Sequence, residues 1–221
     1  MKLINRWPIL LATAAVLIFT SCGKTNEAGK FIPKNAALVV LVDGASLSSK
    51  LPWEDVKNNE WFKKLYSDST VDAYIKTALD NPDNTGIDSK KDFLFFVQKD
   101  SLGGYVGMEG EVKDAAKFKQ FYGNIVKGAV EKEKDGVKYL SNNQVTASWK
   151  GNKFILVVDA PQINDMNKYS NSADDNMLKR KSVTRDGAAV ALQLFSLKEK
   201  SSLAKENKFT ELLDQKGDVH F

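Results

Sequence analysis

The chain has very little of the residue types that build most catalytic and metal centres. Its 221 residues include one cysteine, Cys22, and one histidine, His220. A single cysteine excludes an intramolecular disulfide, and one residue of each type excludes a zinc site built from histidine and cysteine. A Ser-His-Asp triad needs a base beside its nucleophile, and the sequence has no G-x-S-x-G elbow. We therefore expect a protein without catalytic residues, cofactor or metal ion, in which His220 is a strand residue.

An excess of one charge is also missing. The chain has 32 lysine and arginine residues against 28 aspartate and glutamate residues. Two of the basic residues, Lys2 and Arg6, lie in the first 21 residues, so 30 remain against 28 in the rest of the chain. A nearly neutral chain of mixed charges lacks the basic surface of a nucleic-acid-binding protein. We expect no nucleic-acid partner.

The apolar run near the N-terminus is too short to span a membrane. It extends from Ile9 to Phe19, about half of the roughly 20 residues that a transmembrane helix needs. Lys2 and Arg6 come before it, and small residues follow it. A basic start, a short apolar core and small residues are typical of a secretory signal. Residues 1–21 are therefore predicted to be a signal peptide.

The end of this segment resembles the lipobox of bacterial lipoproteins. Thr20 and Ser21 come directly before Cys22, while Phe19 departs from the usual leucine. The resemblance implies that Cys22 becomes the mature N-terminus and carries a diacylglycerol and an N-acyl chain. Several acyl chains make attachment to a membrane effectively permanent. The resemblance also implies the outer membrane, with the protein facing the periplasm, because Gly23 and Lys24 stand directly after Cys22 where an aspartate would favour the inner membrane, and Glu27 is the only acidic residue soon after it.

Residues 22–35 are polar and small, so we expect a tether, and residues 36–160 have the pattern of an α+β domain. Apolar or alternating runs predict strands, and recurrence at three and four residues predicts helices. Strands are expected at 37–42, 93–97, 104–112, 137–140, 145–150 and 154–158, with helices at 52–66, 69–79 and 113–130. This order is βαββαβ followed by a hairpin, which predicts a ferredoxin-like antiparallel sheet with helices on one face.

The remainder of the chain is expected to begin a second, similar unit. Residues 161–186 are polar and predict a linker. Ala188–Phe195 is apolar, like the strand at 37–42, and predicts another strand, followed by helical residues 196–216 and a strand start at 217–221. We expect 187–221 to be the incomplete start of a second α+β unit, in a protein that continues beyond Phe221.

Several other patterns leave two interpretations open. Glycines at 103, 104, 107 and 110 lie on a strand, which favours close packing over a phosphate loop. Residues 81–92 partly follow a calcium loop, but a loop that ends a helix is the simpler interpretation. Trp53, Trp61 and Trp149 fit either a sugar site or core packing. Three carboxylates, Glu109, Glu111 and Asp159, lie on or beside strands, and their spacing does not define a glycosidase pair.

Three segments together resemble an uncharacterised family of Bacteroidota-type lipoproteins that carries a domain of unknown function. They are Phe31–Ala36, Val39–Asp43 and Ser48–Lys50, and the resemblance covers the chain as the N-terminal half of a longer member. It implies a lipid-anchored cell-envelope protein, which we expect to be a non-catalytic scaffold or binding module with an envelope protein or a glycan as partner. The alternative is an envelope hydrolase or carbohydrate-handling protein whose site is completed beyond Phe221.

Overall fold

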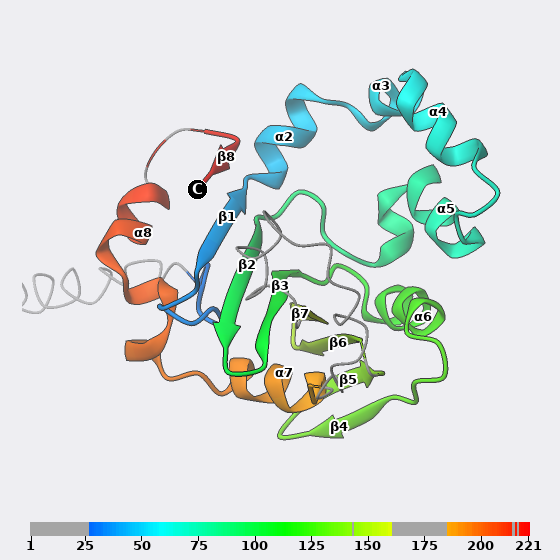
Figure 1. Ribbon diagram of the computed structural model, residues 1–221. Coiled ribbons are helices and arrows are strands. Elements are labelled where there is room, and N and C mark those ends of the chain that lie inside the picture. The colour runs from blue at the N-terminus through cyan, green and yellow to red at the C-terminus, as the bar shows by residue number, and fades with distance from the viewer. Residues whose placement is uncertain (1–26, 143, 161–184, 214, 216) are drawn as a thin grey trace, which may run out of the picture.

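The computed structural model of the protein describes residues 27–142, 144–160, 185–213, 215 and 217–221. Eight strands form one sheet in the order β4-β5-β6-β7-β3-β2-β1-β8 (Figure 1). The strands are β1 (Leu38–Val42), β2 (Phe93–Asp100), β3 (Gly103–Glu111), β4 (Lys132–Lys134), β5 (Val137–Ser141), β6 (Val145–Lys150), β7 (Lys153–Asp159) and β8 (Val219–His220). This confirms the predicted α+β class with an antiparallel sheet, although the sheet is larger than expected.

Seven α-helices occupy the described residues, most of them short. They are α2 (Gly44–Lys50), α3 (Trp53–Asn58), α4 (Glu60–Ser67), α5 (Ala73–Asp80), α6 (Ala115–Ile125), α7 (Gly187–Phe195) and α8 (Asn207–Leu213). Three 3₁₀ helices accompany them: η1 (Pro82–Thr85), η4 (Glu199–Ser201) and η5 (Leu203–Lys205). Five of the α-helices begin after an Asp or Asn whose side chain accepts a backbone N–H of the first turn, the usual N-cap arrangement. Within the described residues, no helix has both the length and the apolarity to cross a membrane.

The sheet consists of two meanders joined side by side. Strands β1, β2 and β3 follow one another, as do β4 to β7, and β3 pairs with β7 to join the two sets. The turn between β4 and β5 is Asp135-Gly136, and both residues have positive φ angles. Two such residues form a type I′ turn, which matches the twist of a hairpin.

The strand order differs from the ferredoxin-like order that the sequence predicted. In a βαβ unit, a crossover helix connects two parallel strands. Here β1 and β2 are directly paired and antiparallel, although helices α2–α5 lie between them in the chain. The chain therefore leaves the sheet after β1, passes through these helices and returns beside β1 as β2. The expected crossover does not form.

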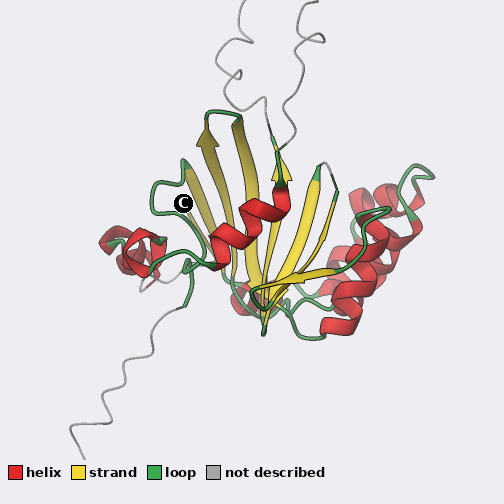
Figure 2. Ribbon diagram, turned by 90° about the horizontal axis from the view of Figure 1, so that it is seen from below, coloured by secondary structure: helices red, strands yellow, loops and turns green. Residues whose placement is uncertain are grey.

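Helices cover both faces of the sheet, whereas the prediction placed them on one (Figure 2). On one face, Leu194 of α7 and Phe209 of α8 pack with strand residues such as Phe96 and Ile155. On the other face, α6 packs against β5, β6 and β7 through a second cluster that includes Phe118 and Trp149. Successive residues of β7 point to opposite faces, so this single strand contributes to both cores.

The predicted strand at Ala188–Phe195 is wrong, because these residues form α7. Asp186 caps the helix by accepting the N–H of Ala189 at 3.0 Å. Helix α7 contacts β5, β6 and β7, and β8 pairs with β1. The described part of 187–221 therefore completes the first sheet and does not begin a separate unit. The predicted strand start at the end of the chain is confirmed as β8.

The tether prediction fails over its last residues. Ile32 is completely buried, and Pro33 forms a β-bridge with Ser202. Residues 27–35 are therefore part of the domain. Cys22, the signal peptide and residues 161–184 of the predicted linker lie outside the described residues. The last two linker residues belong to the domain, because Arg185 is buried and Asp186 caps α7.

Glycines on β3 confirm the prediction of close packing. A Cβ on Gly107 would lie 2.2 Å from the ring of Phe96, and one on Gly110 would lie 2.7 Å from the ring of Phe154. The two rings thus lie across the β3 backbone, one on each face of the sheet.

Candidate functional site

A groove with a volume of about 820 Å³ lies between the sheet and the arm, by which we mean residues 44–80 with helices α2–α5. Figure 1 shows the path of the arm between β1 and β2. Its volume is within the range of about 300–1,000 Å³ that is typical of small-molecule sites. Val42 of β1 and Phe93 of β2 contribute to it from the sheet. Six apolar side chains of the arm line it as well: Leu47, Leu51, Trp53, Val56, Ile75 and Leu79. Five charged side chains also contribute: Glu54, Lys57, Asp80, Asp83 and Lys90.

Contacts inside the arm join its helices to one another. The indole N–H of Trp53 on α3 donates to the carbonyl of Leu79 on α5 at 3.1 Å. The Trp53 ring also meets the ring of Phe62 edge to face, with centroids 5.6 Å apart. These contacts join α3, α4 and α5, so that the outer wall of the groove is a connected unit rather than a loose loop.

Polar side chains at the groove bind nearby backbone groups. The Ser48 hydroxyl donates to the Gly44 carbonyl at 2.6 Å, and the Thr85 hydroxyl donates to the Pro82 carbonyl at 2.7 Å. The Asn81 side chain accepts the N–H of Asp83, which caps η1. Among the charged lining residues, Lys57 pairs with Glu54 at 2.7 Å and Asp83 pairs with Lys113 at 3.0 Å. Because these groups are already engaged, recognition in the groove rests mainly on its apolar walls.

The apolar surface continues from the groove along the open face of the sheet. Side chains two residues apart on a strand share a face, so Val42, Val40 and Leu38 follow one another on β1. Val40 pairs with Phe95 of β2, which continues the row from Phe93. Leu38 is 50% exposed and Phe95 is 41% exposed. A surface of this kind marks a binding region more often than a scattered apolar residue does.

Glu109 is a buried carboxylate near the C-terminal end of β3, on the face opposite the groove. Its side chain accepts the N–H groups of Gly29 at 3.2 Å and Phe31 at 3.3 Å. Burial raises the pKa of Glu109 to about 7, against the lowering effects of Lys153 and the two backbone N–H groups. The N-terminal segment seals this carboxylate from solvent, so it is not accessible to a substrate.

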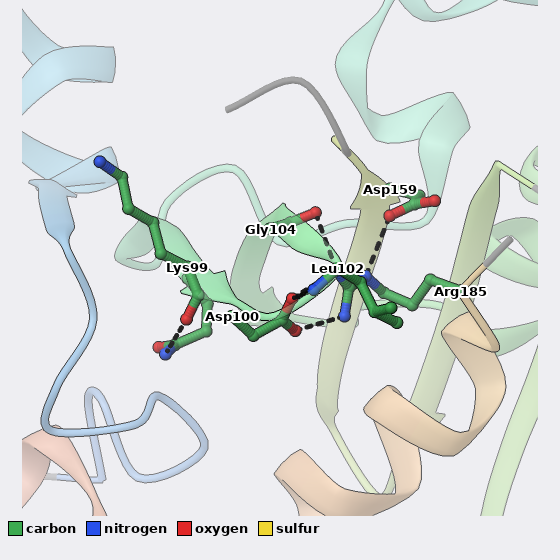
Figure 3. Close-up of polar contacts among 7 residues, drawn as sticks. Lys99, Asp100, Leu102, Gly104, Asp159 and Arg185 are labelled. Carbon is green, nitrogen blue, oxygen red and sulfur yellow. Dashed lines mark hydrogen bonds and ion pairs between the residues drawn. The ribbon is translucent and has the colours of Figure 1, made fainter. Parts of the chain in front are cut away.

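Arg185 is buried between two carboxylates at one end of the sheet (Figure 3). Its guanidinium binds Asp100 at the end of β2 through two nitrogens, and its Nε donates to Asp159 of β7 at 2.9 Å. It also donates to the carbonyl of Gly104 at 3.3 Å and lies 5.3 Å from the ring centroid of Tyr105. Hydrogen bonding to Arg185 lowers the pKa of Asp100. The group fastens the start of α7 to β2 and β7.

His220 lies in β8 near a small polar cluster. The hydroxyl of Ser46 donates to Asp218 at 2.5 Å, and the ammonium of Lys50 contacts the same carboxylate at 2.6 Å. Hydrogen bonds from Lys50 and Ser46 lower the pKa of Asp218, and the charge of His220 adds to this effect. Because the hydroxyl proton of Ser46 points to a carboxylate, Ser46 is not paired with the histidine as a triad nucleophile would be.

The three carboxylates that the sequence singled out are held by different partners. Glu109 is sealed beneath residues 27–33, and Asp159 binds Arg185. Glu111 accepts from Asn152 and Lys153, each at 2.9 Å. In the described part of the chain, no three His, Cys, Asp or Glu side chains gather closely enough to hold a metal ion.

The structure also decides between the two interpretations of the tryptophans and between those of the calcium-like loop. Trp149 is 5% exposed in the core, Trp53 lines the groove, and Trp61 is 61% exposed on α4, so the three do not form one sugar site. In the loop, Asn81 caps η1 and Gly86 has a φ of 73°, while α5 ends at Asp80. This is the helix-ending loop that the simpler interpretation predicted.

Sequence reasoning missed both the groove and the ion pair of Arg185. The groove depends on the distance between the arm and the sheet. The spacing of apolar residues in the sequence does not predict this distance. A weak signal for its lining was present, because the apolar residues of the helical stretch outnumber those that one packed face requires. Arg185 lies in a polar stretch, and nothing in the sequence pairs it with Asp100.

An antiparallel α+β domain with an apolar groove under a helical arm is the class of protein that these observations define. Residues 29–221 match the family described as "Domain of unknown function (DUF4836)", and the chain belongs to this family. The prediction of an uncharacterised domain is thereby confirmed. Neither the curated proteins nor the solved structures include a match to the chain.

Proposed function

We propose that the protein is a non-catalytic binding module of the cell envelope that holds a small apolar molecule or an acyl chain in the groove. In this proposal, acylated Cys22 anchors the protein in the outer membrane, facing the periplasm. The observation that carries the binding role is the groove itself, whose apolar wall is open to solvent and continues onto the sheet. Open apolar pockets of this volume are typical ligand sites in proteins.

The chemistry of the groove favours an apolar ligand over a glycan. A glycan needs directed polar groups, and Ser48, Asn81 and Thr85 are engaged with the backbone. Of the charged lining residues, Glu54 is paired with Lys57, and Asp83 is paired with Lys113. Burial of an apolar ligand surface contributes about 25 cal/mol per Å². Several of the wall residues are partly exposed in the described structure, Leu51 to 50% and Ile75 to 42%. A ligand that covers them gains this stabilisation without displacing polar partners.

The binding test uses a dansyl-labelled undecanoic acid as the probe and Trp53 as the reporter. A variant with Trp61→Phe and Trp149→Phe, in residues 23–221, leaves Trp53 as the only tryptophan. We expect energy transfer from Trp53 to the dansyl group that rises to saturation with the probe. Leu47→Asp or Ile75→Asp should each weaken binding by about tenfold, because a charge in the groove must be desolvated when the probe binds.

Val130→Asp provides the matched control, since Val130 is 75% exposed and does not line the groove. Its affinity for the probe should equal that of the parent. Thermal unfolding of every variant separates loss of the groove from loss of the fold. Absence of saturable transfer, or equal affinity in all variants, would contradict the proposed ligand class. Turnover of ester, peptide or glycoside substrates by the purified protein would contradict the non-catalytic assignment.

The anchor is tested separately. Cys22→Ala should yield an unanchored precursor or a soluble form, whereas the parent should partition fully with membranes. Protease treatment of intact cells should leave the parent undigested if it faces the periplasm. Tight membrane partition of the Cys22→Ala variant would contradict lipid anchoring, and digestion of the parent on intact cells would contradict the assigned side of the membrane.

A further inference from the structure

Helix α2 forms one wall of the groove, although little of it is buried. Of its seven residues only Gly44 is buried. Leu47 and Leu51, which line the groove, are 39% and 50% exposed. A helix this short is not stable in water by itself, so contacts with the rest of the domain must hold it in place. Its apolar side faces the open groove and cannot supply most of those contacts.

Another side of α2 is attached to the C-terminal segment, by which we mean residues 217–221. Ser46 and Lys50 lie four residues apart, so they share a side of the helix, just as the two leucines share the side that faces the groove. The hydroxyl of Ser46 donates to Asp218 at 2.5 Å, and the ammonium of Lys50 donates to the same carboxylate oxygen at 2.6 Å. One carboxylate therefore binds two successive turns of the helix.

Asp218 is itself fixed to the sheet. Its carbonyl accepts the backbone N–H of Asp43 at 2.9 Å, and Asp43 is the N-cap of α2. The next two residues form β8, which pairs with the end of β1. Figure 1 shows β8 and α2 at the same end of β1. The carboxylate therefore joins the sheet to the helix through a short path.

The other side-chain hydrogen bond from α2 to a different part of the described chain is weak. The hydroxyl of Ser48 lies 3.5 Å from the carbonyl of Ser89, and it donates to the carbonyl of Gly44 at 2.6 Å. An ion pair at the surface contributes little to the stability of a whole domain, and the side chain of Lys50 is 62% exposed. Loss of the contact with Asp218 should therefore free the helix without unfolding the protein.

We propose that Asp218 is a positioning residue for the groove: it holds α2 in place as a wall, and its release lets α2 move and weakens ligand binding. A wall that is fixed in advance loses less conformational freedom when a ligand binds. By linkage, a ligand that contacts α2 also stabilises the contact between α2 and Asp218. The effect on affinity rests on the proposed function of the groove, whereas the hold on α2 does not.

Hydrogen exchange of residues 23–221, which include every described residue, tests the hold on α2 without any ligand. Asp218→Ala should speed exchange of the amides of Leu47 and Leu51 by about tenfold, because a charged hydrogen-bond partner is lost and the helix opens locally. Both amides are hydrogen-bonded one turn back along the chain. Amides of the central strand β3 should exchange as in the parent. Lys50→Met breaks the same contact from the helix side and should have a similar effect.

A charge reversal separates this contact from a general loss of stability. Lys50→Glu alone places a second carboxylate beside Asp218 and should speed exchange in α2 at least as much as Asp218→Ala does. Adding Asp218→Lys restores an opposite pair, so exchange should return to within about threefold of the parent. The affinity for dansyl-undecanoic acid should follow the same order. It should fall by about fivefold in Asp218→Ala and in Lys50→Glu, and recover in the double variant.

Glu131→Ala is the matched control, because Glu131 contacts Lys119 at 3.0 Å in a pair of similar exposure and does not line the groove. Its α2 exchange and its affinity should equal those of the parent. Unchanged α2 exchange in both Asp218→Ala and Lys50→Met would overturn the proposal, as would unchanged affinity in a variant whose α2 exchanges faster. Absence of probe binding by the parent would instead contradict the proposed ligand class, and exchange would still decide whether Asp218 holds α2.

Discussion

Glu109 shows how one buried side chain couples this fold to pH. The pKa of its carboxyl is raised from an ordinary 4.5 to about 7, chiefly by burial. The folded state therefore binds more protons than the unfolded state between these two values. Stability in this window falls as pH rises, because the charged form is the one that burial disfavours. Below pH 4.5 and above pH 7, this group adds no slope.

We expect Glu109→Gln to flatten the dependence of stability on pH between 4.5 and 7. In the parent, the free energy of unfolding should decline across this window by up to about 3 kcal/mol, following the linkage between pKa shift and stability. The glutamine cannot ionise, so its curve should lack this decline. Urea denaturation at a series of pH values measures both curves. Glu133→Gln, on an exposed strand, should keep the decline, and an unchanged curve for Glu109→Gln would refute the assignment.

Arg185 is the second residue whose removal should be costly. Its side chain is 5% exposed, and it pairs with the carboxylates of Asp100 and Asp159. Arg185→Met should lower the free energy of unfolding by about 3–5 kcal/mol, because two carboxylates lose their buried partner. Urea denaturation measures the loss. The loss should shrink as pH falls through the carboxyl range, because protonated Asp100 no longer pairs with the guanidinium.

Lys205→Met is the comparison for Arg185. Lys205 contacts Glu199 at 3.5 Å, with both side chains more than half exposed. An exposed ion pair contributes less than about 1 kcal/mol, so this variant should be nearly as stable as the parent. Equal losses in the two variants would mean that burial does not set the strength of the Arg185 pair.

At the scale of the element, the packing of β2 beside β3 depends on the absence of a side chain at Gly107. The Phe96 ring lies over Gly107, and a Cβ there would come within 2.2 Å of it. Gly107→Ala should destabilise the protein by about 1–3 kcal/mol, because Phe96 is 1% exposed and its surroundings leave it little room to move. Thermal unfolding followed by circular dichroism measures the change.

Gly123→Ala is the matched change in a helix. Gly123 lies in α6, and the nearest atom to a new Cβ is on Leu140 at 4.0 Å. Alanine restricts the unfolded chain without a clash, so this variant should gain about 0.5–1 kcal/mol. A gain at both positions would contradict the packing described for Phe96, while a loss at both would contradict the space described beside α6.

The elements themselves were largely predictable, and the failures have physical causes. Strands β1, β2, β3, β5, β6 and β7 were all predicted, as was α6. Strand β4 was missed because Lys132–Lys134 is charged and exposed, although Asp135-Gly136 is a hairpin signal. Helix α7 was misread because a short apolar run fits a buried strand as well as a buried helix. Asp186 as a cap and the shortage of β-branched residues were the signals that favoured a helix.

At the scale of the whole molecule, residues 187–221 should unfold together with the two meanders, β1–β3 and β4–β7. Phe209 of α8 is 5% exposed and packs in the same cluster as Phe96 of β2. Phe209→Ala should lower the free energy of unfolding by about 3–5 kcal/mol, the usual cost of such a truncation in a core. The fluorescence of Trp149 should report the same shift as circular dichroism, since a single domain unfolds cooperatively.

Phe221→Ala serves as the control, because Phe221 is 84% exposed. If α8 belonged to an independent unit, Trp149 would not respond to Phe209→Ala and the two probes would separate. The packing of α8 and β8 against the first strands could not be predicted from the sequence. The spacing of elements predicted an antiparallel sheet, but neither the pairing of β3 with β7 nor the return of β8 to β1 leaves a local pattern.

The β4 edge of the sheet has a consequence for behaviour at high concentration. Every residue of β4 is exposed, and all three are charged. A strand from another copy that paired with this edge would have to place its backbone and side chains against two lysines and a glutamate. At the β4 edge, copies of the domain are therefore expected to stay separate at high concentration, even though the face of the sheet beside β1 and β2 is apolar.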